Sequence, residues 1–145
     1  MKQLSWIAVG VLALAIGCAH APPAPSGSDK PGPQYLIGSE WELRDLGGTP
    51  VIEDSSSPTL SFVDPGRVTG NGSCNRYGGS AELGDGTIKI GPLAATKMAC
   101  TPEVDAQERA YLAALQNASR LELAGGELLV HSDSLEKPLR FSRTR

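Results

Sequence analysis

The chain has 145 residues, a formal net charge of −3 at pH 7 and a sequence pI near 5.3. A chain of this length forms a single domain of ordinary size. Nucleic-acid binding requires a basic surface that complements phosphate, and the acidic balance argues against such a partner.

Residues 1–17 have the pattern of a secretory signal peptide. Lys2 gives a positive start, and an apolar run of eleven residues follows from Trp6 to Ile16. At about 1.5 Å per residue this run is too short to cross a hydrocarbon core of roughly 30 Å. Small residues and Cys18 come next, as in an export signal, so we predict cleavage before Cys18.

The segment Ala15-Ile16-Gly17-Cys18 resembles the lipobox of bacterial lipoproteins. The resemblance implies a diacylglycerol on the Cys18 thiol, and two or three acyl chains are sufficient for stable membrane attachment. Ala19 after the cysteine favours the outer membrane in that sorting scheme. We therefore expect an outer-membrane lipoprotein of the bacterial envelope that faces the periplasm. The alternative is that Cys18 is a small residue of an unlipidated signal peptide.

Residues 18–36 are interpreted as the lipidated cysteine and a proline-rich tether. The stretch Ala19–Gln34 contains five of the 11 prolines and has no apolar periodicity. Such a segment cannot bury enough surface to offset its ordering entropy. In a polyproline II conformation it would reach about 50 Å. A single domain is then expected over residues 37–145.

Short apolar segments separated by turns follow from residue 37. The turns Asp64-Pro65-Gly66, Gly84-Asp85-Gly86 and Gly125-Gly126 are typical of tight connections between strands. They predict about eight short strands. The strand candidates are Trp41–Arg44, Val51–Ile52, Leu60–Phe62, a segment that starts at Val68, Ser80–Leu83, Thr87–Ile90, Leu121–Leu123, Leu128–Val130 and Leu139–Phe141.

One helix is predicted after Thr101, which can cap it, with Pro102 in its first turn. Acidic residues complement the positive end of the helix dipole. These are Glu103, Asp105 and Glu108. An apolar stripe at helical spacing should face the core. It comprises Val104, Tyr111, Leu112, Leu115 and Ala118. The expected fold is therefore α+β, a mainly antiparallel β-sheet with one covering helix.

Two cysteines remain in the domain, Cys74 and Cys100. In an oxidising compartment an even number of thiols predicts a disulfide. Closing a loop of about 27 residues would stabilise the domain by about 3.5 kcal/mol in the chain-entropy model. The alternative is a reactive Cys74 thiol, which would need a histidine, and His131 is the only one in the domain.

Two segments carry a recognisable pattern. Cys74-Asn75-x-Tyr77 lies within a glycine-rich stretch, and it is followed by Thr96-x-Met98-Ala99-Cys100. These motifs resemble the META domain family, and the likeness extends from Ile37 to Phe141. Ser73 is a departure, because many members carry glycine there. The resemblance implies an envelope protein associated with heat or antibiotic stress, and it supplies no catalytic residues.

The candidate binding residues are the motif positions Asn75, Arg76, Tyr77 and Met98. Asn75 can hydrogen-bond neighbouring backbone and brace a turn. The planar guanidinium of Arg76 can recognise a carboxylate or phosphate, or it can pair with a nearby acid of the same chain. A C-terminal group of basic residues could meet anionic headgroups, or it could be one solvated strand face. This group comprises Lys137, Arg140, Arg143 and Arg145.

The chain shows no phosphate-binding loop, no metal-ligand spacing and no nucleophile–histidine–acid set, so we expect neither catalysis, nor a metal, nor a cofactor. The first functional hypothesis is a non-enzymatic accessory or binding module of the envelope, held at the membrane by its lipid anchor and contacting an envelope protein. The alternative is a carrier or sensor of a small hydrophobic or anionic ligand, lodged between sheet and helix.

Overall fold

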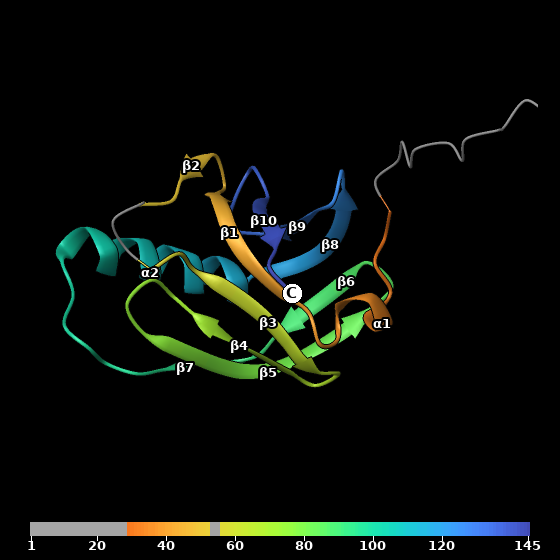
Figure 1. The fold of residues 1–145 in the computed structure, drawn as a ribbon, viewed down its shortest axis with the longest axis horizontal. Helices are drawn as coiled ribbons and strands as arrows, with labels where there is room; N and C mark the ends of the chain where they lie inside the picture. Colours follow the sequence, from red (N-terminus) through yellow and green to blue (C-terminus); the bar gives the residue numbers. More distant parts are fainter. Residues whose placement is uncertain (1–28, 53–55) are drawn as a thin grey trace, which may run out of the picture.

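The computed structural model of the chain describes residues 29–52 and 56–145 (Figure 1). The predicted signal peptide, Cys18 and residues 19–28 of the predicted tether lie outside the described residues. So do residues 53–55.

Within the described residues, ten strands form one antiparallel sheet, and two helices accompany it. The strands are β1 (Glu40–Leu46), β2 (Thr49–Pro50), β3 (Thr59–Asp64), β4 (Arg67–Asn71), β5 (Arg76–Gly84), β6 (Thr87–Ile90), β7 (Ala94–Ala95), β8 (Ala118–Ala124), β9 (Glu127–Ser132) and β10 (Leu139–Arg143). The helices are α1 (Pro33–Leu36) and α2 (Pro102–Gln116).

Eight of these strands close into a barrel, in the order β1-β3-β4-β5-β6-β8-β9-β10, because β10 pairs back with β1. The two-residue strands β2 and β7 pair with β1 and β5 and lie outside the closed path. The mostly antiparallel architecture expected from the sequence is confirmed. The closure was not predicted, since alternation along a strand reports its buried face and not which strands become its neighbours.

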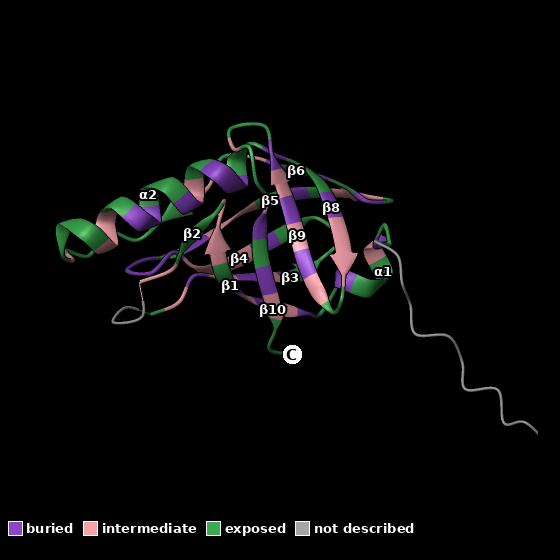
Figure 2. Cartoon of the chain, turned by 90° about the horizontal axis from the view of Figure 1, so that it is seen from above, coloured by how far each residue is buried: buried purple, intermediate pink, exposed green. Residues whose placement is uncertain are grey.

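The barrel interior is the hydrophobic core. Buried residues alternate with partly exposed ones along the strands, as the banding in Figure 2 shows. In β3, for example, Leu60 and Phe62 are buried and Thr59 and Ser61 lie on the outer face. The fully buried side chains are mainly aliphatic or aromatic. They include Leu36, Leu43, Leu60, Phe62, Val68, Tyr111, Leu115, Leu121, Leu128, Val130, Leu139 and Phe141.

Helix α2 lies at one end of the barrel instead of covering a sheet face (Figure 1). Its first turn contains Pro102, and Thr101 accepts a hydrogen bond from the backbone of Val104, as predicted. Tyr111 and Leu115 of the predicted stripe are fully buried. Ala118 is also buried, but it belongs to β8 because the helix ends at Gln116.

Some strand boundaries differ from the predictions. The strand expected over Ser80–Leu83 is longer, because β5 already begins at Arg76 and pairs there with Asn71. Val51 and Ile52 belong to no strand, and the short strand lies at Thr49–Pro50 instead. Strand pairing supplies the missing hydrogen bonds for glycine-rich and proline-containing segments whose local propensity for a strand is low.

Residues 29–36, which the sequence assigned to the tether, contact the domain. The backbones of Asp29 and Leu123 exchange two hydrogen bonds of 2.9 and 2.8 Å, and Gly86 donates to the carbonyl of Pro31 at 3.1 Å. Leu36 is fully buried. This segment lies at the junction of β6 and β8, where Thr87 and Arg120 form the pairing register. Proline composition did not reveal these backbone contacts.

Among the described residues, neither helix is long and apolar enough to cross a membrane.

Candidate functional site: the braced loop and the outer face of β4 and β5

The loop between β4 and β5 is held by a carboxylate from helix α2. Glu108 accepts hydrogen bonds from the backbone N–H of Cys74 at 3.0 Å and of Asn75 at 2.6 Å. Its second oxygen accepts from the side-chain amide of Asn75 at 2.7 Å. Three N–H donors therefore surround this buried carboxylate, which compensates the cost of removing it from water.

Asn75 connects the same loop to the segment that precedes α2. Its side-chain oxygen accepts from the backbone N–H of Met98 at 2.7 Å and from the hydroxyl of Thr96 at 3.1 Å. The Asn75 side chain is 6 % exposed and is fully engaged in these contacts. Its role in this structure is to join β5, the Thr96–Cys100 segment and helix α2 through Glu108.

The backbone of the loop is strained at Ser73, whose φ of 118° is a value that favours glycine. Two contacts hold it there. The N–H of Ser73 donates to the side chain of Asn71 at 2.8 Å, and Gln107 donates to the Ser73 hydroxyl at 2.8 Å. Gln107 in turn accepts from the backbone of Ile52 at 2.8 Å. Serine is thus accommodated at a position where many family members carry glycine.

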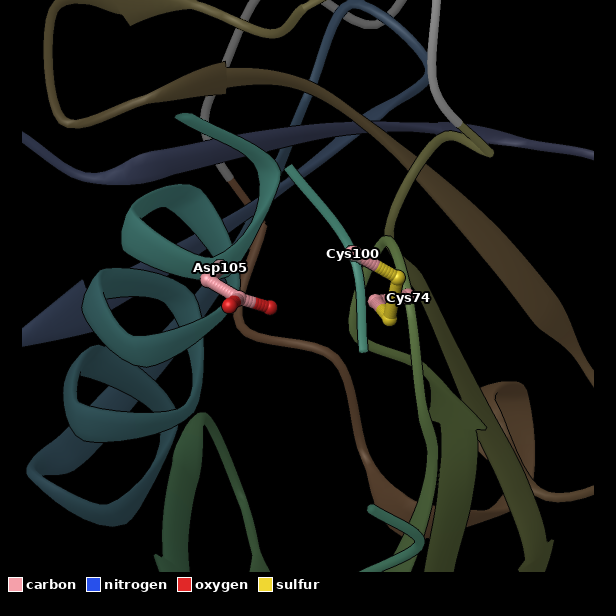
Figure 3. Close-up of side chains that lie close together, drawn as sticks. All are labelled: Cys74, Cys100 and Asp105. Atoms are coloured by element: carbon pink, nitrogen blue, oxygen red, sulfur yellow. A yellow bond between two sulfur atoms is a disulfide. The ribbon is translucent and has the colours of Figure 1, made fainter. Parts of the chain in front are cut away.

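Cys74 and Cys100 form a disulfide, with their Cα atoms 6.2 Å apart. A carboxylate oxygen of Asp105 and the two sulfurs lie within 4.8 Å of one another, and Figure 3 shows this carboxylate on the helix side of the disulfide. Because the sulfurs are bonded to each other, they present no thiolates to a metal ion or to a substrate. The arrangement joins the motif loop covalently to the start of α2.

Two tyrosines share one backbone acceptor inside the barrel. The hydroxyls of Tyr77 and Tyr111 donate to the carbonyl of Thr59 at 2.7 and 2.9 Å, and they lie 3.0 Å from each other. Burial raises the pKa of both hydroxyls well above the ordinary value of 10.0. The predicted motif residue Tyr77 is therefore a core residue.

The outer face of β4 and β5 is different, because it is open and carries two arginines. Its hollow is lined by Arg67, Thr69, Arg76, Gly78 and Ser80, and by Ala94 of β7. A second, polar hollow continues from Arg76 across β3 towards β1. In the part of the chain that the structure describes, neither the Arg67 nor the Arg76 guanidinium has a hydrogen bond or an ion pair.

The other predicted positions are distributed differently. Met98 is 60 % exposed and follows Thr96, whose N–H donates to the carbonyl of Arg76 at 3.0 Å. In the C-terminal basic group, Arg140 pairs with Glu127 at 2.6 Å. Arg143 lies over the Trp41 ring at 5.7 Å. Intramolecular contacts thus engage these two arginines.

Sequence reasoning missed Glu108 and Gln107 as parts of this site. Glu108 was interpreted as a charge that complements the helix dipole, but its carboxylate is buried and faces the motif loop. The signal was present in the spacing, since Glu108 stands three and seven residues before the core residues Tyr111 and Leu115. An acid on the apolar stripe indicates a buried partner, although the sequence does not say which one.

These observations define a small closed-barrel domain in which an end-on helix braces a disulfide-bonded motif loop. A sequence model of the META domain matches residues 34–145. The chain belongs to the META domain family. It is 27 % identical over 97 residues to "Heat shock protein HslJ" of Escherichia coli (strain K12). The aligned region covers 66 % of this chain and 69 % of that protein.

Solved structures share the fold. The NMR structure of a protein from Burkholderia xenovorans has a TM-score of 0.66 and 29 % identity, and covers 86 % of this chain and 95 % of that one. A second NMR structure has a TM-score of 0.62 at 24 % identity, and the match covers 76 % of this chain and 92 % of that one. The crystal structure of a duf4847 family protein from Bacteroides vulgatus has a TM-score of 0.55 at 15 % identity, and the match covers 75 % of this chain and 94 % of that one. The last two likenesses concern the fold alone.

Proposed function

We propose that the chain is a lipid-anchored, non-enzymatic accessory module of the bacterial envelope that supports the envelope under stress. The observation that carries this proposal is the use of the motif's polar groups. Asn75 and Glu108 satisfy each other and the loop backbone, and both domain cysteines are oxidised. Groups that hold a loop in place in this way are not available to act as acids, bases or nucleophiles.

The anchoring part of the proposal is supported by the sequence before residue 29. The lipobox-like residues end at Cys18, and lipidation would place the domain at the outer membrane, facing the periplasm. The stress part is supported by membership of the META domain family and by the similarity to a protein named for heat shock.

A carrier of a hydrophobic ligand between sheet and helix has less support. Tyr111, Leu115 and Phe141 are fully buried in that space, and the Tyr111 ring makes an edge-on contact with Tyr77 and a tilted contact with Phe141, with ring centroids 5.9 and 6.3 Å apart. A ligand lodged there would have to displace packed core side chains. The anionic version of the ligand hypothesis has a different location, the open outer face of β4 and β5.

Gene deletion tests the proposed role. Loss of the protein should lower tolerance to heat, detergent and hydrophobic antibiotics, and the wild-type gene should restore it. A Cys18→Ala variant, which has no thiol to acylate, should not restore tolerance and should lose the incorporation of labelled palmitate. Unchanged tolerance after deletion would contradict the stress role, and full rescue by Cys18→Ala would contradict the need for an anchor.

A further inference from the structure

The charges on the barrel wall are not distributed evenly. On β1, β8 and β10, the arginines Arg44, Arg120 and Arg140 each pair with a glutamate, at 3.1, 3.3 and 2.6 Å. On β4 and β5, Arg67 and Arg76 are exposed and have no such partner among the described residues. An unpaired guanidinium keeps all its donors available for an anion from outside.

The two arginines stand at opposite ends of one shallow hollow. Arg76 pairs in register with Asn71, and Arg67 lies four residues away along β4, so their Cα atoms are about 13 Å apart along the strands. The floor between them is formed by small residues, Thr69, Gly78 and Ser80. The described lining of this hollow contains no carboxylate. Acidic residues border it, since Asp64 of β3 is the register partner of Arg67 and the neighbouring hollow beside Arg76 is lined in part by Glu40 and Glu42. The floor itself offers two guanidinium groups without a carboxylate among its lining residues, and a flat ligand can approach it closely.

Gly78 at the centre of this floor is not required by packing. A Cβ at Gly78 would lie 3.5 Å from Thr69 and 3.6 Å from the backbone of Val68, which are ordinary contacts. By contrast, a Cβ at Gly70 would lie 1.9 Å from the Thr59 carbonyl, and one at Gly79 would lie 2.8 Å from Leu93. A strand glycine without an internal reason marks a place where something outside the fold approaches the backbone.

Exposed apolar side chains border the same face at both ends. Val63 of β3 is 53 % exposed next to the β3–β4 turn, and the N–H of the neighbouring Gly38 donates to the Phe62 carbonyl at 2.7 Å, which brings Ile37 close to it. Met98 is 60 % exposed, two residues after Thr96, whose N–H donates to the carbonyl of Arg76 at 3.0 Å. Basic groups flanked by apolar side chains are the chemistry of a surface that rests on anionic lipid headgroups.

We propose that the outer face of β4 and β5 binds the phosphate groups of anionic phospholipids through Arg67 and Arg76, with Val63 and Met98 at the headgroup boundary. The inference rests on the proposed anchoring. The described chain begins at Asp29, and the residues from Cys18 to that point span at most about 40 Å when fully extended. The anchor therefore holds this face within reach of the bilayer, at a high effective concentration of headgroups.

The test uses the full protein, extracted from its own envelope and placed in lipid nanodiscs. The discs contain phosphatidylcholine alone or mixed with phosphatidylglycerol in equal parts. Phenylglyoxal modifies accessible arginines, and mass spectrometry reads each site. Modification of Arg67 and Arg76 should slow about fivefold in the anionic discs only. Arg140 on the opposite wall is the internal control and should react equally in both.

Several outcomes would overturn the proposal. If Arg67 and Arg76 are modified at the same rate in neutral and anionic discs, the proposal is wrong. If anionic discs protect Arg140 as strongly as Arg67 and Arg76, the protection reflects general charge attraction and not a defined face. Protection by soluble glycerol phosphate in neutral discs, without protection by anionic lipid, would assign the hollow to a soluble phosphate. If the intact mass of the protein shows no acyl chains, the proposed anchoring is wrong. Arginine modification is then measured on the protein mixed with vesicles of the same two lipid compositions, which tests the lipid-binding face separately.

A crosslinking experiment tests the same face independently. A photoreactive side chain at Ser80, which is exposed in the hollow, should form adducts with phosphatidylglycerol. The double variant Arg67→Gln with Arg76→Gln should lose these adducts, while Arg140→Gln should keep them. Equal lipid adducts in the double variant, or adducts to a protein alone, would contradict lipid binding by the two arginines without affecting the deletion phenotype.

Discussion

The carboxylate of Glu108 accepts two hydrogen bonds from Asn75, one from the backbone N–H at 2.6 Å and one from the side-chain amide at 2.7 Å. The two residues lie 33 positions apart in sequence and are both buried. This contact fixes helix α2 against the motif loop, and it gives the asparagine of the motif a structural role.

Replacing Glu108 by glutamine should destabilise the domain by about 1–3 kcal/mol. The glutamine NH₂ group cannot accept from Asn75, so at least one buried donor loses its acceptor. Thermal unfolding should show a melting temperature lower by several degrees. Glu103→Gln, an exposed change in the first turn of the same helix, is the control and should change the free energy of unfolding by only a few tenths of a kcal/mol. Equal shifts would contradict the brace.

Loss of the disulfide should also lower stability. Cys74 and Cys100 are 26 positions apart, and the chain-entropy model gives about 3.5 kcal/mol for a loop of this size. Cys74→Ser and Cys100→Ser should each lower the melting temperature, and reductant should reproduce the effect in the wild type only. A wild-type melting curve that reductant does not change would show that the bond contributes nothing to stability.

Gly70 and Gly78 should respond oppositely to alanine. Gly70→Ala places a Cβ 1.9 Å from the Thr59 carbonyl, so the strands must separate and the loss should reach several kcal/mol. Gly78→Ala has ordinary space and restricts the unfolded chain, so stability should remain equal or rise by about 0.5 kcal/mol. Chemical denaturation of both variants provides the measurement. A severe loss for Gly78→Ala would show that packing does require this glycine.

Stability should decrease at alkaline pH because of Tyr77 and Tyr111. Burial raises the pKa of both hydroxyls, so the folded state retains protons that the unfolded chain releases near pH 10.0. Their contribution is complete below that pH and is lost as the pH rises towards the folded-state pKa. Denaturation at a series of pH values should therefore show a steep decline above pH 10. The Tyr77→Phe variant should show a shallower decline, and an unchanged slope would contradict the assignment.

Local features were predictable where short-range chemistry determines them. Gly84-Asp85-Gly86 and Gly125-Gly126 predicted two hairpins, which the structure forms as β5–β6 and β8–β9. Thr101 and Pro102 predicted the start of α2. In each case the turn or cap requires residues within a few positions of one another, so the sequence contains the whole signal.

Other features depended on partners far along the chain. The closure of β10 onto β1 joins Trp41 to Arg143, and the contacts of Asp29 with Leu123 join the presumed tether to the wall. Backbone hydrogen bonds form both contacts, and such bonds leave no side-chain signature. The position of Glu108 on the apolar stripe indicated burial, but its partners, the N–H groups of Cys74 and Asn75, became known only from the structure.

The sequence by itself determined the antiparallel strands, the single long helix, the family and the lipobox-like start, because periodicity, turn residues and motif spacing are local properties. Only the tertiary structure decided that the sheet closes into a barrel, that the motif residue Asn75 points inward while Arg76 points outward, and that Arg67 shares a face with it. The physical reason is strand alternation combined with register: neighbouring residues face opposite sides, and only pairing brings distant ones together.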